Sequence, residues 1–205
     1  MKIERLIVGQ LQTNCYLAWD EERSEAVIID PGDDADFIIR KIQDLKIQPI
    51  FIVATHGHFD HVLAVTELKL AYLIPFLMHK ADLFLLKKSG ATAQYFTEIR
   101  TDPILPPDKF VKEGDLIKFG KEKLKVIETP GHTPGSIALF TPGILFSGDT
   151  VFAQGVGRTD FSYASSKKLK NSLKKLFQLP EKTVVYPGHG PTTTIGKKIT
   201  IAERG

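Results

Sequence analysis

Three histidines and one aspartate fall within six consecutive positions of the sequence, at His56, His58, Asp60 and His61. Imidazole and carboxylate groups in one short segment suit zinc, iron or manganese. The alternative is a chance grouping of surface or core polar residues. Burying four such groups without partners would cost much free energy, and a bound metal removes that cost. We therefore predict a metal-binding loop here.

The predicted loop lies between a strand and a helix. Residues 49–54 form an apolar, β-rich run that is typical of a buried strand. Residues 62–70 carry apolar side chains at helical spacing. Ligands of open α/β sheets gather at the carboxyl ends of the strands, and this loop would stand at such an end.

The spacing His-x-His-x-Asp-His resembles the signature of the metallo-β-lactamase superfamily. Three later segments follow in the order that the family pattern requires: Gly-His-Thr-Pro-Gly-Ser at 131–136, Ser-Gly-Asp-Thr at 147–150 and Tyr-Pro-Gly-His-Gly at 186–190. The resemblance runs from about Leu11 to Gly196. It implies an α/β fold, an αββα sandwich of two mixed β-sheets flanked by helices.

The resemblance also implies two divalent metal ions, with zinc expected and iron or manganese as alternatives. One ion would be held by His56, His58 and His132, the other by Asp60, His61 and His189, with Asp149 as the bridge. Two ions about 3.5–4 Å apart can hold a hydroxide between them and lower the pKa of bound water toward about 7. Asp60 and Asp149 are the expected catalytic residues, and Asp60 would also orient the hydroxide.

Three further segments resemble the short glyoxalase II-like hydrolases: Thr-Asn-Cys-Tyr at 13–16, Gly-Arg-Thr-Asp-Phe at 157–161 and Pro-Gly-His-Gly-Pro at 187–191. The implied reaction is hydrolysis of S-lactoylglutathione or a related thioester. Thioesters suit such a site because a thiolate, with a parent pKa near 8.5, leaves without a strong general acid. Arg158 matches the place of a basic residue for the glutathione moiety, and a structural ion pair with Asp160 or another acid is the alternative of equal weight.

The resemblance leaves a second enzyme class open. Persulfide dioxygenases share the first motif and the 157–161 segment, and use one iron on the residues that match His56, His132 and Asp149. An inactive metal-binding module is disfavoured because no ligand is missing. β-Lactamase activity is also less favoured, because both three-ligand sets match the hydrolase pattern.

Composition and patterning give no support for a nucleic-acid-binding, membrane-spanning or exported protein. The 205 residues carry 27 basic and 24 acidic side chains, a net charge of +3 that gives no case for nucleic acid. No apolar run has the length of a membrane span, and the start lacks a signal-peptide pattern. Cys15 is the only cysteine, so we expect a small core residue, no internal disulfide and a cytoplasmic protein. We expect a single domain over 1–205 without a C-terminal helical domain, as a monomer or a homodimer.

The remaining pattern predicts the supporting elements. Strands are expected at 3–8, 14–19, 25–30, 73–78 and 183–186, and an antiparallel second sheet at 115–119, 124–128, 137–140 and 144–146. Pro75 would place its strand at a sheet edge. Helices are expected after Asp33 or Asp34, at 80–88, at 165–178 behind a serine cap, and at 195–203.

Two features of the pattern stay open between a functional and a plain interpretation. Residues 89–107 show no clear periodicity, so they form either an active-site lid or a surface connection. His79 has no other donor near it in sequence, so we expect a surface or supporting residue rather than a ligand. Gly148 is expected to bend the backbone so that Asp149 reaches inward.

Overall fold

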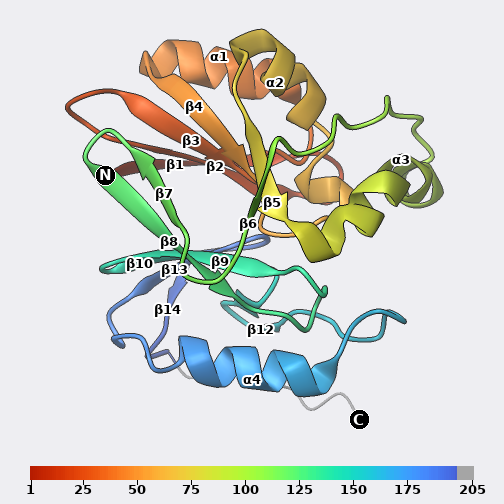
Figure 1. The fold of residues 1–205 in the computed structure, drawn as a ribbon, viewed down its shortest axis with the longest axis vertical. Helices are drawn as coiled ribbons and strands as arrows, with labels where there is room; N and C mark the ends of the chain where they lie inside the picture. Colours follow the sequence, from red (N-terminus) through yellow and green to blue (C-terminus); the bar gives the residue numbers. More distant parts are fainter. Residues whose placement is uncertain (198–205) are drawn as a thin grey trace.

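Two six-stranded β-sheets lie face to face in the computed structural model, which describes residues 1–197 (Figure 1). The first sheet contains, in order, β1 (Lys2–Val8), β2 (Thr13–Trp19), β3 (Glu25–Ile29), β4 (Gln48–Val53), β5 (Phe76–His79) and β6 (Lys109–Val111). The pairs from β1 to β3 are antiparallel and those from β3 to β6 are parallel, so the sheet is mixed.

The second sheet is also mixed. Its order is β14 (Thr193–Thr194), β13 (Val184–Pro187), β10 (Ile144–Gly148), β9 (Ile137–Thr141), β8 (Glu122–Glu128) and β7 (Leu116–Phe119). The four strands predicted at 115–146 pair antiparallel, as expected, and β13 and β14 are antiparallel as well. β10 and β13 pair in parallel, which makes the sheet mixed. A separate small hairpin joins β11 (Val151–Phe152) and β12 (Gly155–Val156).

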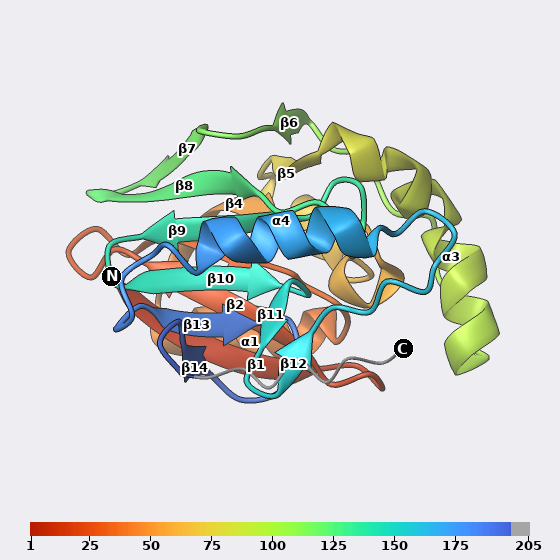
Figure 2. The same ribbon diagram turned by 90° about the horizontal axis from the view of Figure 1, so that it is seen from below.

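Helices cover both outer faces. α1 (Ala35–Leu45) and α2 (Val65–Tyr72) lie on the first sheet, and α4 (Ser166–Leu176) lies on the second (Figure 1). α3 (Leu83–Thr97) stands at one end of the sandwich (Figure 2). Two single 3₁₀ turns complete the helices, η1 (Phe59–His61) and η2 (Lys80–Asp82). This arrangement confirms the predicted αββα sandwich.

Alternation along the strands explains the layers. In β2, Cys15 and Leu17 are fully buried against the helical side with Ile42 of α1. Tyr16, the next residue, points into the core between the sheets, where its ring meets Phe146 at a centroid distance of 5.3 Å. Successive side chains of a strand face opposite sides, so a strand buried on both faces is apolar throughout. Burial raises the pKa of the Cys15 thiol, which agrees with an inert core residue.

The predicted helix at 165–178 is confirmed, together with its cap. The Ser165 hydroxyl accepts from the Lys168 backbone N–H at 3.3 Å. Leu169, Leu173 and Leu176 are buried in a third core layer between α4 and the second sheet. The lysines of the helix cover its solvent side, as a solvated face requires.

Three local predictions are wrong. Asp34 precedes α1 with a left-handed φ of 55°, and its carboxylate accepts from Gly9 N–H at 2.8 Å instead of capping the helix. β5 is an inner strand of its sheet. Pro75 lies before the first residue of β5, so the N–H that proline lacks is not needed there, and the Pro75 carbonyl accepts from Ile52 N–H. α3 continues past Ser89, whose hydroxyl bonds the Leu86 carbonyl at 2.6 Å within the helix.

The end of the predicted 89–107 segment is tied to α2. Thr66 Oγ1 donates to the Pro103 carbonyl at 3.3 Å and accepts from Leu105 N–H at 2.9 Å, and Lys69 donates to the Pro106 carbonyl at 3.2 Å. These contacts favour the surface connection over the lid. Of the helix predicted at 195–203, residues 195–197 form a turn and the rest lies outside the described residues.

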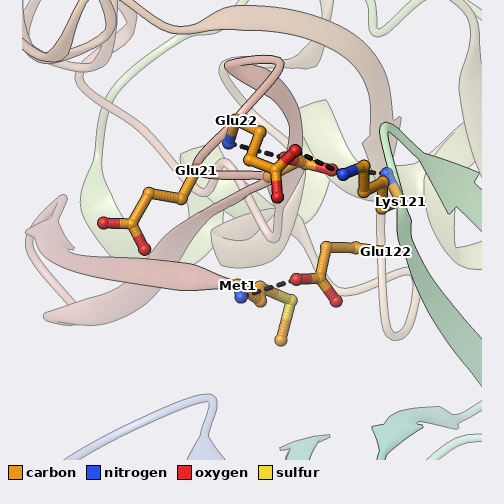
Figure 3. A pocket seen from close by; sticks show the side chains of 6 residues that line it. Met1, Glu21, Glu22, Lys121 and Glu122 are labelled. Carbon is orange, nitrogen blue, oxygen red and sulfur yellow. Dashed lines mark hydrogen bonds and ion pairs between the residues drawn. The ribbon is translucent and has the colours of Figure 1, made fainter.

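Polar contacts join the two sheets at the end where β3 and β8 begin. The Met1 amino group lies 2.6 Å from a Glu122 carboxylate oxygen, Asp20 accepts from Lys121 N–H, and the Lys121 ammonium pairs with Glu22 (Figure 3). Of the residues that line this small pocket, Asp20, Glu22 and Lys121 link the β2–β3 and β7–β8 turns, and Met1 pairs with Glu122, so we interpret it as structural. Within residues 1–197, no helix combines the length and the apolarity that crossing a bilayer needs.

Candidate metal centre

Seven histidine and aspartate side chains meet at one edge of the sandwich, each just after the end of a strand. His56, His58, Asp60 and His61 follow β4, His132 follows β8, Asp149 follows β10, and His189 follows β13. β8, β10 and β13 run in the same direction, so their carboxyl ends share an edge. Segments that are far apart in the chain therefore place their histidine and aspartate side chains at the same edge of the sandwich.

The first group consists of three imidazoles. The Nε2 atoms of His56 and His132 each lie 3.1 Å from Nδ1 of His58. All three nitrogens are close enough to hold one ion. His56 and His132 are buried and His58 is half-buried, so the nitrogens converge away from bulk solvent.

The second group combines a carboxylate with two imidazoles. Oδ2 of Asp60 lies 3.2 Å from Nε2 of His189 and 3.6 Å from Nε2 of His61. The Thr13 hydroxyl donates to the same oxygen at 3.1 Å. These three side chains can also hold one ion between them.

Asp149 lies between the two groups. Its Oδ1 is 3.5 Å from Nε2 of His61, and its Oδ2 is 3.6 Å from His132 and 3.7 Å from His189. The backbone reaches this position through Gly148, whose φ of +49° is the left-handed conformation that glycine adopts without strain. A Cβ there would also collide with Thr55. The structure thus places one carboxylate against both groups.

The donor set fits divalent metal ions. His61 Nε2 and Asp149 Oδ1 are buried and have no hydrogen-bond partner among the described residues. Buried polar atoms without partners are rare and costly. Both atoms point into the space that the groups share, and imidazole nitrogen and carboxylate oxygen are ligands of zinc and iron. The cluster is therefore able to hold metal, and ligation by these seven residues stays a prediction.

The Nδ1 atoms of His132 and His189, which face away from the cluster, hold these two rings in place through hydrogen bonds. Nδ1 of His132 donates to the Arg158 carbonyl at 2.8 Å, and Nδ1 of His189 donates to the Leu11 carbonyl at 3.1 Å. Such contacts fix the tautomer and the orientation of a ligating imidazole. Both rings therefore keep Nε2 facing the site.

Asp30 supports both groups from behind. Its Oδ2 lies 3.1 Å from Nδ1 of His61 and accepts from the Thr55 hydroxyl at 2.8 Å. That hydroxyl lies 3.1 Å from Nδ1 of His56. Sequence reasoning treated Asp30 only as the end of a strand. Its position one strand from the histidine loop, at the carboxyl end of β3, is the signal that could have identified it.

Tyr163 and Asp82 are the other supporting residues that sequence reasoning missed. The Tyr163 hydroxyl lies 2.8 Å from Nε2 of His58, and its ring stacks on Phe161 at 5.3 Å. Asp82, in a 3₁₀ turn, is fully buried beside both histidine loops. No local pattern marks either residue, because each depends on contacts between distant segments.

The pKa values of His56 and His58 move in the opposite direction from the pKa of His61. Burial and neighbouring His132 lower the pKa of His58 to about 3, and burial lowers the pKa of His56. For His61, burial acts downward, but Asp60, Asp149 and Asp30 outweigh it and raise the pKa to about 10. His56 and His58 are thus neutral imidazoles, the form that binds metal, whereas the surrounding carboxylates favour positive charge on His61.

Arg158 is engaged with a neighbour. Its guanidinium makes two hydrogen bonds to Asp160, at 2.8 and 2.6 Å, and stands 4.6 Å from the Phe161 ring centroid. Both charged side chains are more than 60% exposed, at 61% and 63%. The ion pair that the sequence offered as an alternative is therefore formed, and any substrate anion must compete with Asp160.

His79 is in none of the metal-competent groups found among residues 1–197. Its Nε2 lies 3.2 Å from Glu128, and its Nδ1 accepts from Ala81 N–H at 3.2 Å. This placement agrees with the expectation of a supporting rather than a ligating residue.

Two relatives with named activities differ in the reaction that they catalyse. A Haemophilus influenzae protein named hydroxyacylglutathione hydrolase GloC is 36% identical over 97% of this chain and 95% of its own length. The mitochondrial persulfide dioxygenase ETHE1 of Mus musculus is 33% identical over 86% of this chain and 63% of its own. The chain is thus similar in sequence to a hydrolase and to an oxidoreductase.

Solved structures agree with the fold over nearly the whole chain. The B3 metallo-beta-lactamase BLEG-1 has a TM-score of 0.89 and 34% identity, covering 96% of each chain. TTHA1623 in a di-iron-bound form has a TM-score of 0.87 and 38% identity, covering 94% of this chain and 95% of its own. The family model of the metallo-beta-lactamase superfamily matches residues 8–189, which include all seven residues of the cluster. This chain belongs to the metallo-beta-lactamase superfamily.

Proposed function

We propose that the protein is a two-metal hydrolase of thioesters, of the glyoxalase II type, with S-lactoylglutathione or a related thioester as substrate. The observation that carries the proposal is the pair of three-residue groups with Asp149 between them. His56, His58 and His132 would hold one ion, and Asp60, His61 and His189 the other. Zinc is the expected metal, and iron is the alternative because the chain is similar to a protein whose structure holds two iron ions.

Divalent ions bound there would polarise the substrate carbonyl and lower the pKa of a coordinated water toward about 7. The chain itself supplies the orientation. For Asp60, burial acts to raise the pKa, but His61 and His189 outweigh it, so the carboxylate is an acceptor at neutral pH. It would hold the attacking water by one of its protons. Protonation of the leaving thiolate is not required, because its parent pKa is near 8.5.

The test combines metal analysis with a substrate panel. We expect two ions per chain, and hydrolysis of S-lactoylglutathione that disappears after chelation and returns with added metal. A β-lactam belongs in the panel because BLEG-1 is a similar protein. A metal-loaded chain that hydrolyses no thioester, or only the β-lactam, would refute the proposal.

The second candidate is a mononuclear iron persulfide dioxygenase, which the similarity to mouse ETHE1 favours. The residues that would hold the iron are His56, His132 and Asp149, and Nε2 of His132 lies 3.6 Å from the Asp149 carboxylate. One tightly bound iron, no second site on titration, and oxygen uptake with glutathione persulfide would establish this function instead.

A further inference from the structure

Asp82 is a fully buried carboxylate that accepts three hydrogen bonds. Its Oδ2 accepts from Gly57 N–H at 3.0 Å and from the Thr133 hydroxyl at 2.6 Å. Its Oδ1 accepts from Gly135 N–H at 2.6 Å. Burial raises the pKa of Asp82, and these three donors act in the opposite direction. None of them belongs to the turn that carries Asp82, so the carboxylate connects separate segments.

The three donors lie within the two loops that carry the first histidine group. Gly57 stands between His56 and His58, and Thr133 directly follows His132. One loop leaves the first sheet after β4, and the other leaves the second sheet after β8. The Asp82 carboxylate therefore spans the gap between the two sheets at the point where their histidines must meet.

Two glycines show independently how closely the loops contact this residue. A Cβ built on Gly57 would lie 2.8 Å from the Asp82 carbonyl oxygen and 3.0 Å from its Cβ. A Cβ built on Gly135 would lie 2.8 Å from the Asp82 Cγ. These separations leave no room for a side chain at either glycine, so each loop contacts Asp82 through a backbone that only glycine allows.

We propose that Asp82 is a positioning residue for the first metal group, setting the distance between the His56–His58 loop and the His132 loop. The proposal rests on the metal centre of the proposed function. The second group has separate supports: Thr13 for Asp60, Asp30 for His61 and the Leu11 carbonyl for His189. A change at Asp82 should therefore weaken one metal site and spare the other.

Asp82→Asn is the informative variant because it nearly preserves size. An amide has one acceptor oxygen, so its NH2 group must face either Gly135 N–H or the donors from Gly57 and Thr133. At least one of the three hydrogen bonds to the loops is lost. Asp108→Asn is the matched control: Asp108 also accepts a backbone N–H, from Phe76 at 2.8 Å, and pairs with Lys69 at 2.7 Å.

The experiment is a zinc titration against a competing chelator, with wild type, Asp82→Asn and Asp108→Asn. Loss of a partner that orients ligands typically lowers metal affinity about 10–100-fold. We expect that loss at one site of Asp82→Asn only, and little change in Asp108→Asn. Repeating the titration in a His189→Ala background, where only the first group is complete, assigns the weakened site. Thr133→Val removes the bond to Asp82 and a second bond to the Ser136 hydroxyl within the same loop. It should weaken the same site by about two- to tenfold, and decides the matter if Asp82→Asn does not fold.

Each outcome separates this inference from the proposed function. Two ions in wild type with unchanged affinities in Asp82→Asn would overturn the role of Asp82 and leave the two-metal centre intact. Equal weakening of both sites would also overturn it, because a general structural defect has that effect. A single ion at the first group that Asp82→Asn weakens would support the role of Asp82 and refute the two-metal function. A wild-type chain that binds no zinc would overturn both.

Discussion

Arg158→Ala tests whether this residue recognises the glutathione moiety. The guanidinium is already bonded twice to Asp160 and lies over the Phe161 ring. Its backbone carbonyl, which accepts from His132, is unaffected by a change of side chain. The substitution therefore removes one charged group near the site and leaves the support of the histidine in place.

The expected magnitude follows from competition with Asp160. A hydrogen bond to a charged group contributes about 1.5–3 kcal/mol, or about 10–150-fold in kcat/KM. Because the side chain is 61% exposed and must leave or share its partner, the lower end applies. We expect Arg158→Ala to lower kcat/KM for S-lactoylglutathione about tenfold. Asp160→Asn, which releases the guanidinium, should raise it by less than about fivefold.

The assay compares kcat/KM for S-lactoylglutathione and for a small uncharged thioester in wild type and both variants, with metal content measured alongside. Only the glutathione ester should respond to Arg158→Ala. Equal losses with both thioesters would mean that the ion pair supports the site rather than the substrate. No loss with either would mean that the guanidinium stays with Asp160 throughout the reaction.

Asp149→Ala should abolish hydrolysis and weaken both metal sites, whereas His79→Ala should leave activity within a few fold; equal damage from the two would refute the ligand assignment. Tyr163→Phe keeps the aromatic ring but removes the hydroxyl beside His58, so metal affinity should fall about tenfold in chelator competition. The highly exposed Tyr95 provides the control substitution Tyr95→Phe, and equal effects would contradict the prediction. Finally, the hydrogen bond that Arg158 donates to Asp160 lowers the pKa of this carboxyl group to about 2. The pair with Arg158 therefore stabilises the folded protein above the ordinary aspartate pKa of about 3.9, and this stabilisation is lost as the pH falls through the lowered pKa of Asp160 in the folded state. Arg158→Ala should return the pKa toward 3.9 in an NMR titration of the carboxyl group, and an unchanged pKa would exclude the pair in solution.

The sequence alone determined the fold class and the set of candidate ligands. Four of the seven side chains lie within six positions, and the others follow strand-like runs in a fixed order. Strand alternation and helical spacing are local properties, so they predict buried faces from neighbouring residues. A loop after a strand must also lie at the carboxyl end of that strand, and strands that run in the same direction share this edge of the sheet. These local rules predicted the α4 stripe and the edge where the cluster forms, whereas the two mixed sheets were implied by the resemblance to the metallo-β-lactamase signature.

Tertiary structure decided what supports the cluster. Asp82 is a turn residue in sequence, yet its donors come from loops on two sheets, 25 to 53 positions away. The partner of Arg158 was open in the sequence, because nearby Asp160 and a substrate are equally plausible ligands for a guanidinium. β5 became an inner strand because Pro75 lies before the ladder, and α3 passed Ser89 because burial outweighs a weak propensity. Each of these outcomes depends on which distant atoms share a buried space, and residue spacing along the chain does not contain that information.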